Sequence, residues 1–216
     1  MANFSTDTVK VIDHPLVQHK LAILRDKYTG TQQFSDLISE IATFMCYEAT
    51  RDLPLGPTPV ETPICTCQAQ MIDDRKLALV PILRAGTGML DGARQAIPAA
   101  KVGHIGIYRD HETRQPVDYY AKFPAEIEKR RVLLLDPMLA TGGTAVDAIS
   151  KLKKCGVPGE RIKFLCIIAA PEGLEIVQKA HPDVLVYTCH IDDYLNEDAY
   201  IVPGLGDAGD RIFGTK

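Results

Sequence analysis

The chain has 216 residues, of which 46% are hydrophobic and 24% charged, and its formal net charge is −4. This length and balance suit one well-cored globular domain and exclude a disordered chain. The acidic balance, without any basic block, argues against an extended nucleic-acid-binding surface. Residues 1–7 are polar, and no apolar run approaches the ~18 residues of a membrane helix, so we expect a cytoplasmic protein without signal peptide or membrane span.

Residues 1–70 are predicted to form N-terminal helices and an extended arm. Apolar residues recur at helical spacing, as at Leu37, Ile38 and Ile41, and predict helices at 15–25 and 34–50. Proline cannot continue a helix, so an extended arm is expected through Pro54, Pro57, Pro59 and Pro63. We expect this N-terminal part to serve a homo-oligomer, either a dimer or a tetramer.

After residue 74 the pattern alternates between short apolar strands and amphipathic helices. Such alternation predicts an α/β fold, a twisted and mainly parallel sheet flanked by helices. No composition break or internal repeat divides the chain, so residues 1–216 are predicted to be one domain. Strands are expected at 77–83, 102–108, 131–135, 162–169 and 184–189, and helices at 87–96, 145–154 and 172–180.

The sequence between two of these strands, residues 109–124, is polar and irregular. The run from His111 to Tyr120 is long for a simple connection. We predict a flap that closes over a substrate and excludes water from a reactive intermediate.

The most informative segment follows the predicted strand at 131–135. Asp136 ends that strand, Pro137 removes a ladder donor, and residues 141–144 read Thr-Gly-Gly-Thr before a helix. Free amide groups and hydroxyls at a helix N-terminus bind phosphate, and an adjacent carboxylate accepts hydrogen bonds from ribose hydroxyls. The segment therefore indicates a sugar-phosphate site. The alternative is an ordinary strand, loop and helix with an incidental glycine turn.

Two arginines are predicted at the same sheet edge. Arg84 lies in a small-residue loop after the strand at 77–83, and Arg109 ends the next strand at the root of the flap. Either guanidinium can grip phosphate oxygens in a bidentate manner. The alternative for Arg84 is a surface residue that caps a helix, and strand-end arginines such as Arg109 are common.

The C-terminal segment, residues 199–216, is rich in glycine. Gly204, Gly206 and Gly209 match the spacing of a dinucleotide-binding fingerprint, but Pro203 intervenes and the chain ends too soon for the helix and strand that fingerprint requires. We predict instead a loop whose backbone approaches a flat ligand closely and adds little packing.

The remaining chemistry-bearing residues are predicted to be structural. Three cysteines lie in apolar patterns and should behave as small hydrophobes: Cys46, Cys166 and Cys189. Cys65 and Cys67 have no second pair at zinc spacing, so reduced thiols on a strand are favoured over a metal site. The six histidines form no metal motif, and the acidic turn Asp192-Asp193 is predicted to be solvated.

The phosphate loop, Asp-Pro-Met-Leu-Ala-Thr-Gly-Gly at 136–143, resembles that of the uracil phosphoribosyltransferases, a type I phosphoribosyltransferase family. Segments 13–20 and 50–55 also look like N-terminal parts of that family, and all the motifs come in its order. The resemblance implies the conversion of uracil and phosphoribosyl diphosphate (PRPP) into UMP and pyrophosphate, with Mg²⁺ carried by PRPP rather than by protein ligands. It also implies GTP as an allosteric effector.

The resemblance further implies roles for individual residues. The catalytic residues would be Arg84, Arg109, Asp136 and Asp207. The residues in contact with uracil would be Ile201, Gly206, Asp207 and Ala208. PRPP would be held by Arg84, Arg109, Asp136, Pro137, Met138, Leu139, Ala140, Thr141, Gly142, Gly143, Thr144 and Asp207. No side chain is identified as the base for uracil N1.

Two rival functions remain from the sequence. One is a regulator that keeps the PRPP loop but binds a nucleic acid instead of turning substrate over, which the acidic balance disfavours. The other is a dinucleotide-dependent oxidoreductase, which the short tail after Gly209 disfavours.

Overall fold

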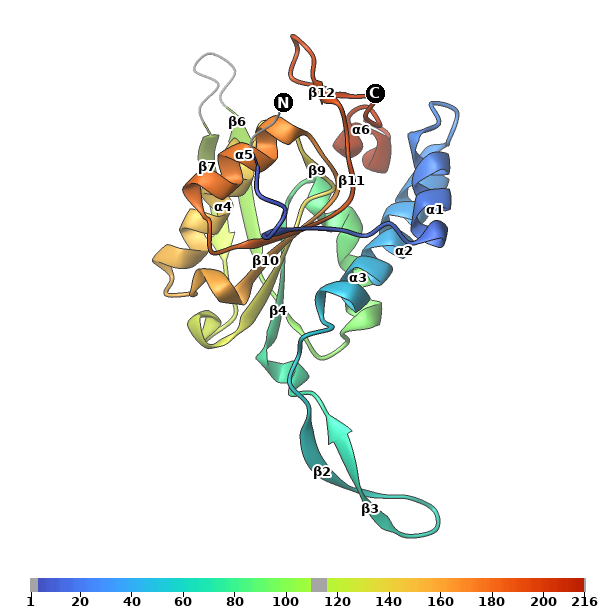
Figure 1. The fold of residues 1–216 in the computed structure, drawn as a ribbon, viewed down its shortest axis with the longest axis vertical. Coiled ribbons are helices and arrows are strands. Elements are labelled where there is room, and N and C mark those ends of the chain that lie inside the picture. Colours follow the sequence, from blue (N-terminus) through green and yellow to red (C-terminus); the bar gives the residue numbers. More distant parts are fainter. Residues whose placement is uncertain (1–3, 110–115, 216) are drawn as a thin grey trace.

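The computed structural model describes residues 4–109 and 116–215. Its centre is a sheet with the strand order β1-β11-β10-β8-β4-β6-β7, in which β5 also pairs with β4 and β9 with β10 (Figure 1). The described pairs are parallel except β6 with β7. The strands are β1 (Val9–Val11), β4 (Leu77–Leu83), β5 (Lys101–Val102), β6 (His104–Arg109), β7 (Pro116–Lys122), β8 (Arg131–Leu135), β9 (Met138–Leu139), β10 (Ile162–Ala169) and β11 (Leu185–Ile191).

Helices cover both faces of this sheet, which explains why its central strands are apolar at successive positions. Leu133 and Leu135 of β8 belong to one core cluster, whereas Val132 and Leu134 belong to the other. The first cluster lies under α1 (Pro15–Arg25), α2 (Thr31–Ala49), α3 (Leu90–Ala96) and α6 (Ala208–Phe213), and the second under α4 (Gly143–Lys154) and α5 (Pro171–Ala180) (Figure 1). The predicted α/β class is confirmed.

The predicted boundaries agree best for the buried central strands and for the first helix. The strands β4, β8 and β10 and the helix α1 match their predicted ranges at both ends. Helix α1 begins cleanly because Pro15 occupies its first turn and the His14 side chain accepts a hydrogen bond from the Leu16 amide at 3.2 Å. Helix α2 begins three residues earlier than predicted, at Thr31.

The predicted extended arm is a β-hairpin. Strands β2 (Gly56–Glu61) and β3 (Thr66–Met71) pair in antiparallel register and project away from the body of the molecule (Figure 1). The prolines at 57 and 59 fit because this two-stranded ribbon has an unpaired edge. Ile64 in the connecting loop is 92% exposed, so the hairpin carries apolar surface that the described chain does not cover.

The second half of the predicted flap is a strand, β7, which returns antiparallel to β6 with an irregularity between Gly106 and Ile107. Residues 110–115 of the flap lie outside the described residues. Strands β1 and β7 form the two edges of the sheet, and the sequence did not predict them because each is short or polar.

Two predictions about the C-terminal part of the chain are wrong. The segment after Tyr200 was expected to add little packing, yet Ile201, Leu205, Ala208 and Ile212 are buried in the core cluster under α2. The reason is that Gly204 and Gly206 make turns with positive φ, while the apolar residues beside them and those of α6 point into the core. Strands β12 (Tyr194–Leu195) and β13 (Ile201–Val202) form a further short hairpin here.

The acidic turn is also not solvated as predicted. The Asp192 side chain is 0% exposed because it pairs with Arg25, while Asp193 is exposed. The apolar cysteines, in contrast, are buried as predicted, and Cys65 and Cys67 are exposed free thiols. Among the described residues, no helix combines the length and apolar character needed to cross a membrane.

Candidate active site

The phosphate loop begins where β8 ends. The Asp136 amide donates to the Leu165 carbonyl at 3.2 Å, and the Pro137 carbonyl accepts from the Ile167 amide at 2.9 Å. Strand β9 then pairs with β10 before the chain turns into α4. The backbone of this loop is therefore fixed by the sheet, before any ligand binds.

The turn into α4 requires glycine. Gly142 has φ +82°, and a Cβ atom there would lie 2.9 Å from the Gly173 carbonyl oxygen. No side chain caps α4, and the first-turn amides of a helix lack helical acceptors. These donors lie at the positive end of the helix dipole, as a phosphate site needs.

A cavity of about 470 Å³ brings three separate parts of the sequence together. This volume suits a small-molecule ligand. Its wall includes Arg84, Ala85, Ile107, Asp136, Met138, Ala140, Thr141, Thr144, Asp198, Ala199, Tyr200, Ile201, Gly206, Asp207 and Gly209. A larger cavity of about 820 Å³ lies at the base of the β2–β3 hairpin, but none of the predicted site residues lines it.

Asp136 occupies the sheet side of the cavity. Burial raises the pKa of its carboxyl to about 7, while a hydrogen bond from the Met138 amide opposes this rise. The group is therefore poised between its two protonation states near neutral pH. Ligand hydroxyls that donate to the carboxylate would favour the ionised form.

Arg84 follows β4 on the same edge, after a cis Leu83–Arg84 peptide bond. Its side chain is 61% exposed and reaches to 3.8 Å from Asp210 Oδ1, with the guanidinium 5.8 Å from the Phe213 ring centroid. The loop behind it is tightly packed, because a Cβ atom on Gly86 would lie 2.3 Å from the Leu135 carbonyl oxygen. An exposed guanidinium thus extends from a closely packed backbone.

The terminal loop forms the opposite wall. Gly206 has φ +80°, and the Val202–Pro203 peptide bond is cis. Asp207 faces the cavity and also caps α6, since its Oδ1 accepts from the Asp210 amide at 2.9 Å. A planar ligand here would meet backbone groups and one carboxylate.

Several predicted site residues do not line the cavity. The Leu139 side chain packs in the core under α4, and Ala208 is buried in the core cluster under α2. Pro137, Gly142 and Gly143 contribute backbone geometry around the loop rather than cavity wall. Arg109 ends β6, the neighbour of β4, so its backbone lies at the same carboxyl edge as Arg84.

The wall also contains four residues that were not named as site residues from the sequence, although Ala199 and Tyr200 lie in the segment 199–216 that was predicted to approach a flat ligand: Ile107, Asp198, Ala199 and Tyr200. The last three precede β13, and Ala199 adopts φ +63°, which is unusual for a residue other than glycine. No motif marks Asp198, Ala199 and Tyr200, because they reach the cavity through the β12–β13 hairpin rather than through a loop after a sheet strand.

Comparisons with known proteins show the family to which the chain belongs. The sequence profile of the family described as "Uracil phosphoribosyltransferase" matches residues 11–215. The uracil phosphoribosyltransferase of Anoxybacillus flavithermus is 59% identical over 208 residues, covering 96% of this chain and 99% of that protein.

Solved structures resemble the fold as well. The AQ2163 protein of Aquifex aeolicus matches with a TM-score of 0.91 and 36% identity, covering 96% of this chain and 99% of that one. The adenine phosphoribosyltransferase of Trypanosoma brucei, solved with AMP, pyrophosphate and ribose 5-phosphate, matches with a TM-score of 0.58 and 12% identity over 95% of this chain and 91% of its own. That likeness shows a shared fold alone. The match along nearly the whole chain, joined to a phosphate loop and a terminal loop on one cavity, places this chain in the uracil phosphoribosyltransferase family.

Proposed function

We propose that this protein transfers the 5-phosphoribosyl group of PRPP to N1 of uracil and releases UMP and pyrophosphate, a step of pyrimidine salvage. The observation that carries the proposal is the single cavity on which the phosphate loop, Arg84 and the terminal loop meet. One wall suits a sugar phosphate, and the other suits a planar base.

In the proposed reaction the bond from ribose C1 to the pyrophosphate oxygen breaks and the bond from C1 to uracil N1 forms. The N1 proton leaves, and the departing pyrophosphate keeps the electron pair of the broken bond. Positive charge grows on the ribose ring while negative charge grows on the pyrophosphate. Arg84 and Arg109 would stabilise that negative charge, a contribution that develops in the transition state.

The phosphate loop would hold the ribose and its 5′-phosphate. The first-turn amides of α4 and the hydroxyls of Thr141 and Thr144 would bind the phosphate, with Met138 and Ala140 completing the wall. Asp136 would accept hydrogen bonds from the ribose hydroxyls. Because this backbone is tied to β10, its contribution is mainly positioning.

The terminal loop would recognise uracil. Uracil presents an N3–H donor between two carbonyl acceptors, and backbone groups of Ile201 and Gly206, which line the cavity, can complement that edge. Cytosine reverses two of the three features, so the mismatch would leave buried polar groups unpaired at a cost of roughly 1–3 kcal/mol each. Asp207 would lie where base and ribose meet.

We assign Mg²⁺ to the bound PRPP rather than to a protein site. Among the described residues, no group of three or more His, Cys, Asp or Glu side chains could hold a metal ion. Asp136 and Asp207 both line the cavity, and they fit a role around a metal that PRPP already chelates. When bound, Mg²⁺ supplies charge neutralisation on the pyrophosphate.

We also propose a cytoplasmic homo-oligomer, a dimer or tetramer, with GTP as an effector. The β2–β3 hairpin supports oligomerisation, because it projects from the body with Ile64 at 92% and Leu55 at 60% exposure (Figure 1). Light scattering during gel filtration, with and without GTP, tests both the assembly and the effector.

A substrate panel tests the activity. Purified protein with PRPP and Mg²⁺ is offered uracil, cytosine, hypoxanthine, adenine and orotate in parallel, and pyrophosphate release is followed. We expect release with uracil and little with the others. PRPP binding by calorimetry without any turnover would instead favour the PRPP-binding regulator. Asp207→Ala should impair uracil turnover while PRPP still binds, and unchanged kinetics of that variant would refute the pocket assignment.

A further inference from the structure

The terminal loop is also held by a largely buried charge pair, Arg25 and Asp192, outside the cavity wall. The Gly204 amide donates to Asp192 Oδ2 at 2.8 Å, and the Gly204 carbonyl accepts from Arg25 Nη1 at 2.7 Å. Both backbone groups of one loop residue are therefore fixed by two side chains. Neither Arg25 nor Asp192 lines the cavity.

Two hydrogen bonds join the Arg25 guanidinium to the Asp192 carboxylate. Arg25 Nη2 lies 2.5 Å from Asp192 Oδ1, and Arg25 Nη1 lies 2.8 Å from Oδ2, which is a bidentate arrangement. His190 Nδ1 lies 2.8 Å from the same Oδ1. Burial would raise the pKa of Asp192, but the hydrogen bonds from Arg25, Gly204 and His190 outweigh it and hold that pKa below its ordinary value. The Asp192 carboxylate is thus ionised, and both of its oxygens have hydrogen-bond partners.

A second arginine fixes the next residue of the loop. Arg211 Nη1 donates to the Leu205 carbonyl at 2.8 Å and to the Leu24 carbonyl at 2.9 Å. Two consecutive loop carbonyls, those of Gly204 and Leu205, are therefore turned toward the end of α1. The next two residues, Gly206 and Asp207, line the cavity.

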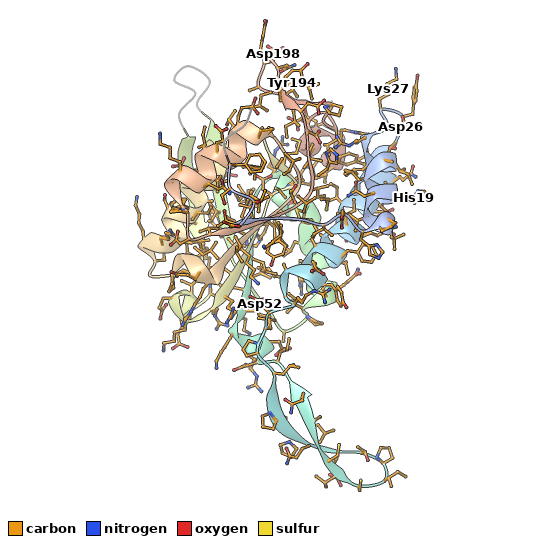
Figure 2. The ribbon with its side chains drawn as sticks, viewed as in Figure 1. His19, Asp26, Lys27, Asp52, Tyr194 and Asp198 are labelled. Carbon is orange, nitrogen blue, oxygen red and sulfur yellow. The ribbon has the colours of Figure 1, made fainter. Side chains whose placement is uncertain are left out.

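This network joins parts of the chain that are far apart in sequence. Asp26 and Lys27, which follow Arg25 at the end of α1, lie at the same end of the molecule as Tyr194 and Asp198 of the β12–β13 region (Figure 2). A buried ion pair is weak evidence for stability, because desolvation offsets the attraction, but it can impose one geometry. Backbone recognition of a planar base needs such geometry, since a shift of about 1 Å misplaces its donors and acceptors.

We propose that Arg25 and Asp192 are positioning residues for pyrimidine recognition, acting through the backbone of Gly204 on the loop that contacts the base. The inference rests on the proposed placement of uracil at the terminal loop. It predicts that damage to the pair weakens uracil recognition selectively and leaves PRPP recognition nearly intact, because the phosphate loop is fixed separately by β10.

The test compares Asp192→Asn and Arg25→Lys with the wild type. Asparagine keeps the size of Asp192 but turns an amide donor toward groups that are themselves donors, so one of them loses its partner. We expect the uracil KM of Asp192→Asn to rise about tenfold or more and its PRPP KM to stay within about twofold. Arg25→Lys keeps the positive charge but loses the paired N–H donors of the planar guanidinium. We therefore expect its uracil KM to rise less than that of Asp192→Asn. Discrimination against cytosine should fall in both variants.

Asp52→Asn serves as the matched control, because Asp52 pairs with buried Lys163 at 2.5 Å and lies on the side of the globular body from which the β2–β3 hairpin projects, away from Tyr194 and Asp198 (Figure 2). All variants are also compared by thermal unfolding. Equal rises in the uracil and PRPP KM values, or an unchanged uracil KM in folded Arg25→Lys and Asp192→Asn, would overturn the proposal. Should Asp192→Asn fail to fold, Arg25→Lys and Arg25→Gln decide by the same criterion.

The proposed pocket can fail separately. If Asp207→Ala also leaves the uracil KM and turnover unchanged, uracil does not bind at the terminal loop, and the underlying placement is wrong. If Asp207→Ala impairs turnover but the Arg25 and Asp192 variants do not change the uracil KM, only the positioning role is wrong.

Discussion

Replacing Asp136 by asparagine should make the protein more stable and much less active. Burial raises the pKa of this carboxyl from 3.8 to about 7, so the folded protein must hold a poorly solvated carboxylate above that pH. At 1.36 kcal/mol per unit of pKa shift, this rise corresponds to a loss of folding stability of at most about 4 kcal/mol. Asparagine keeps an acceptor for the Met138 amide and removes the charge.

Proton linkage determines how the stability difference between Asp136→Asn and wild type changes with pH. Because the folded pKa is raised, the favourable protonated state is fully present below about pH 4 and is lost as the pH rises to about 7. We therefore expect Asp136→Asn and wild type to be equally stable near pH 4, and the variant to be more stable by about 1–4 kcal/mol at pH 8, water in the open cavity reducing the full value.

Urea unfolding between pH 4 and 8 measures this difference, with Asp13→Asn, an exposed carboxyl, as the control. Turnover of the Asp136 variant should fall about 10- to 100-fold, since a charged acceptor for the ribose hydroxyls is lost. A variant that is no more stable than wild type at pH 8, or that turns over uracil normally, would refute the reasoning.

Three further predictions concern the rest of the site. Arg84→Ala should lower kcat by about 100-fold or more with little change in uracil KM, because Arg84 stabilises the negative charge that develops on the pyrophosphate in the transition state. Pyrophosphate release measures both constants, and an unchanged kcat/KM for PRPP would show that Arg84 is a surface residue without a catalytic role. Gly142→Ala should weaken PRPP binding in calorimetry and destabilise the protein by about 1–3 kcal/mol, because φ is +82° and the added Cβ would approach Gly173 O; a wild-type affinity for PRPP would show that the phosphate loop does not bind it. A chain truncated after Val202 should lose its cooperative unfolding transition in circular dichroism, since Leu205 and Ile212 are core residues; a folded truncated chain that still binds PRPP would contradict this.

The sequence predicted the central strands and the loop between β8 and α4 well because local signals determine both. The strands β4, β8 and β10 are continuous apolar runs ended by a charged or small residue, and such runs are typical of strands buried on both faces. Asp136 and the glycine pair at 142–143 stand between a strand and a helix in sequence, so their common location needs no tertiary information.

The terminal loop was harder to interpret because its environment is formed by distant residues. Ile201 and Leu205 are spaced too irregularly by glycines to show a helix or strand period, so their burial against α2 is invisible locally. The burial of Asp192 likewise depends on Arg25, which lies 167 residues away. A charge is predicted to be solvated unless its partner is known.

The two walls of the cavity therefore depend on different kinds of support. The phosphate wall is positioned by backbone hydrogen bonds to β10 and by glycine geometry at Gly142, so most side-chain changes nearby should leave its shape intact. The base wall is positioned by the side chains of Arg25, Asp192 and Arg211 and by the packing of α6. Substitutions far from the ligand can consequently alter base recognition, whereas comparable substitutions behind the phosphate loop should alter stability first. For this reason the ratio of the uracil KM to the PRPP KM is the most informative measurement on this protein.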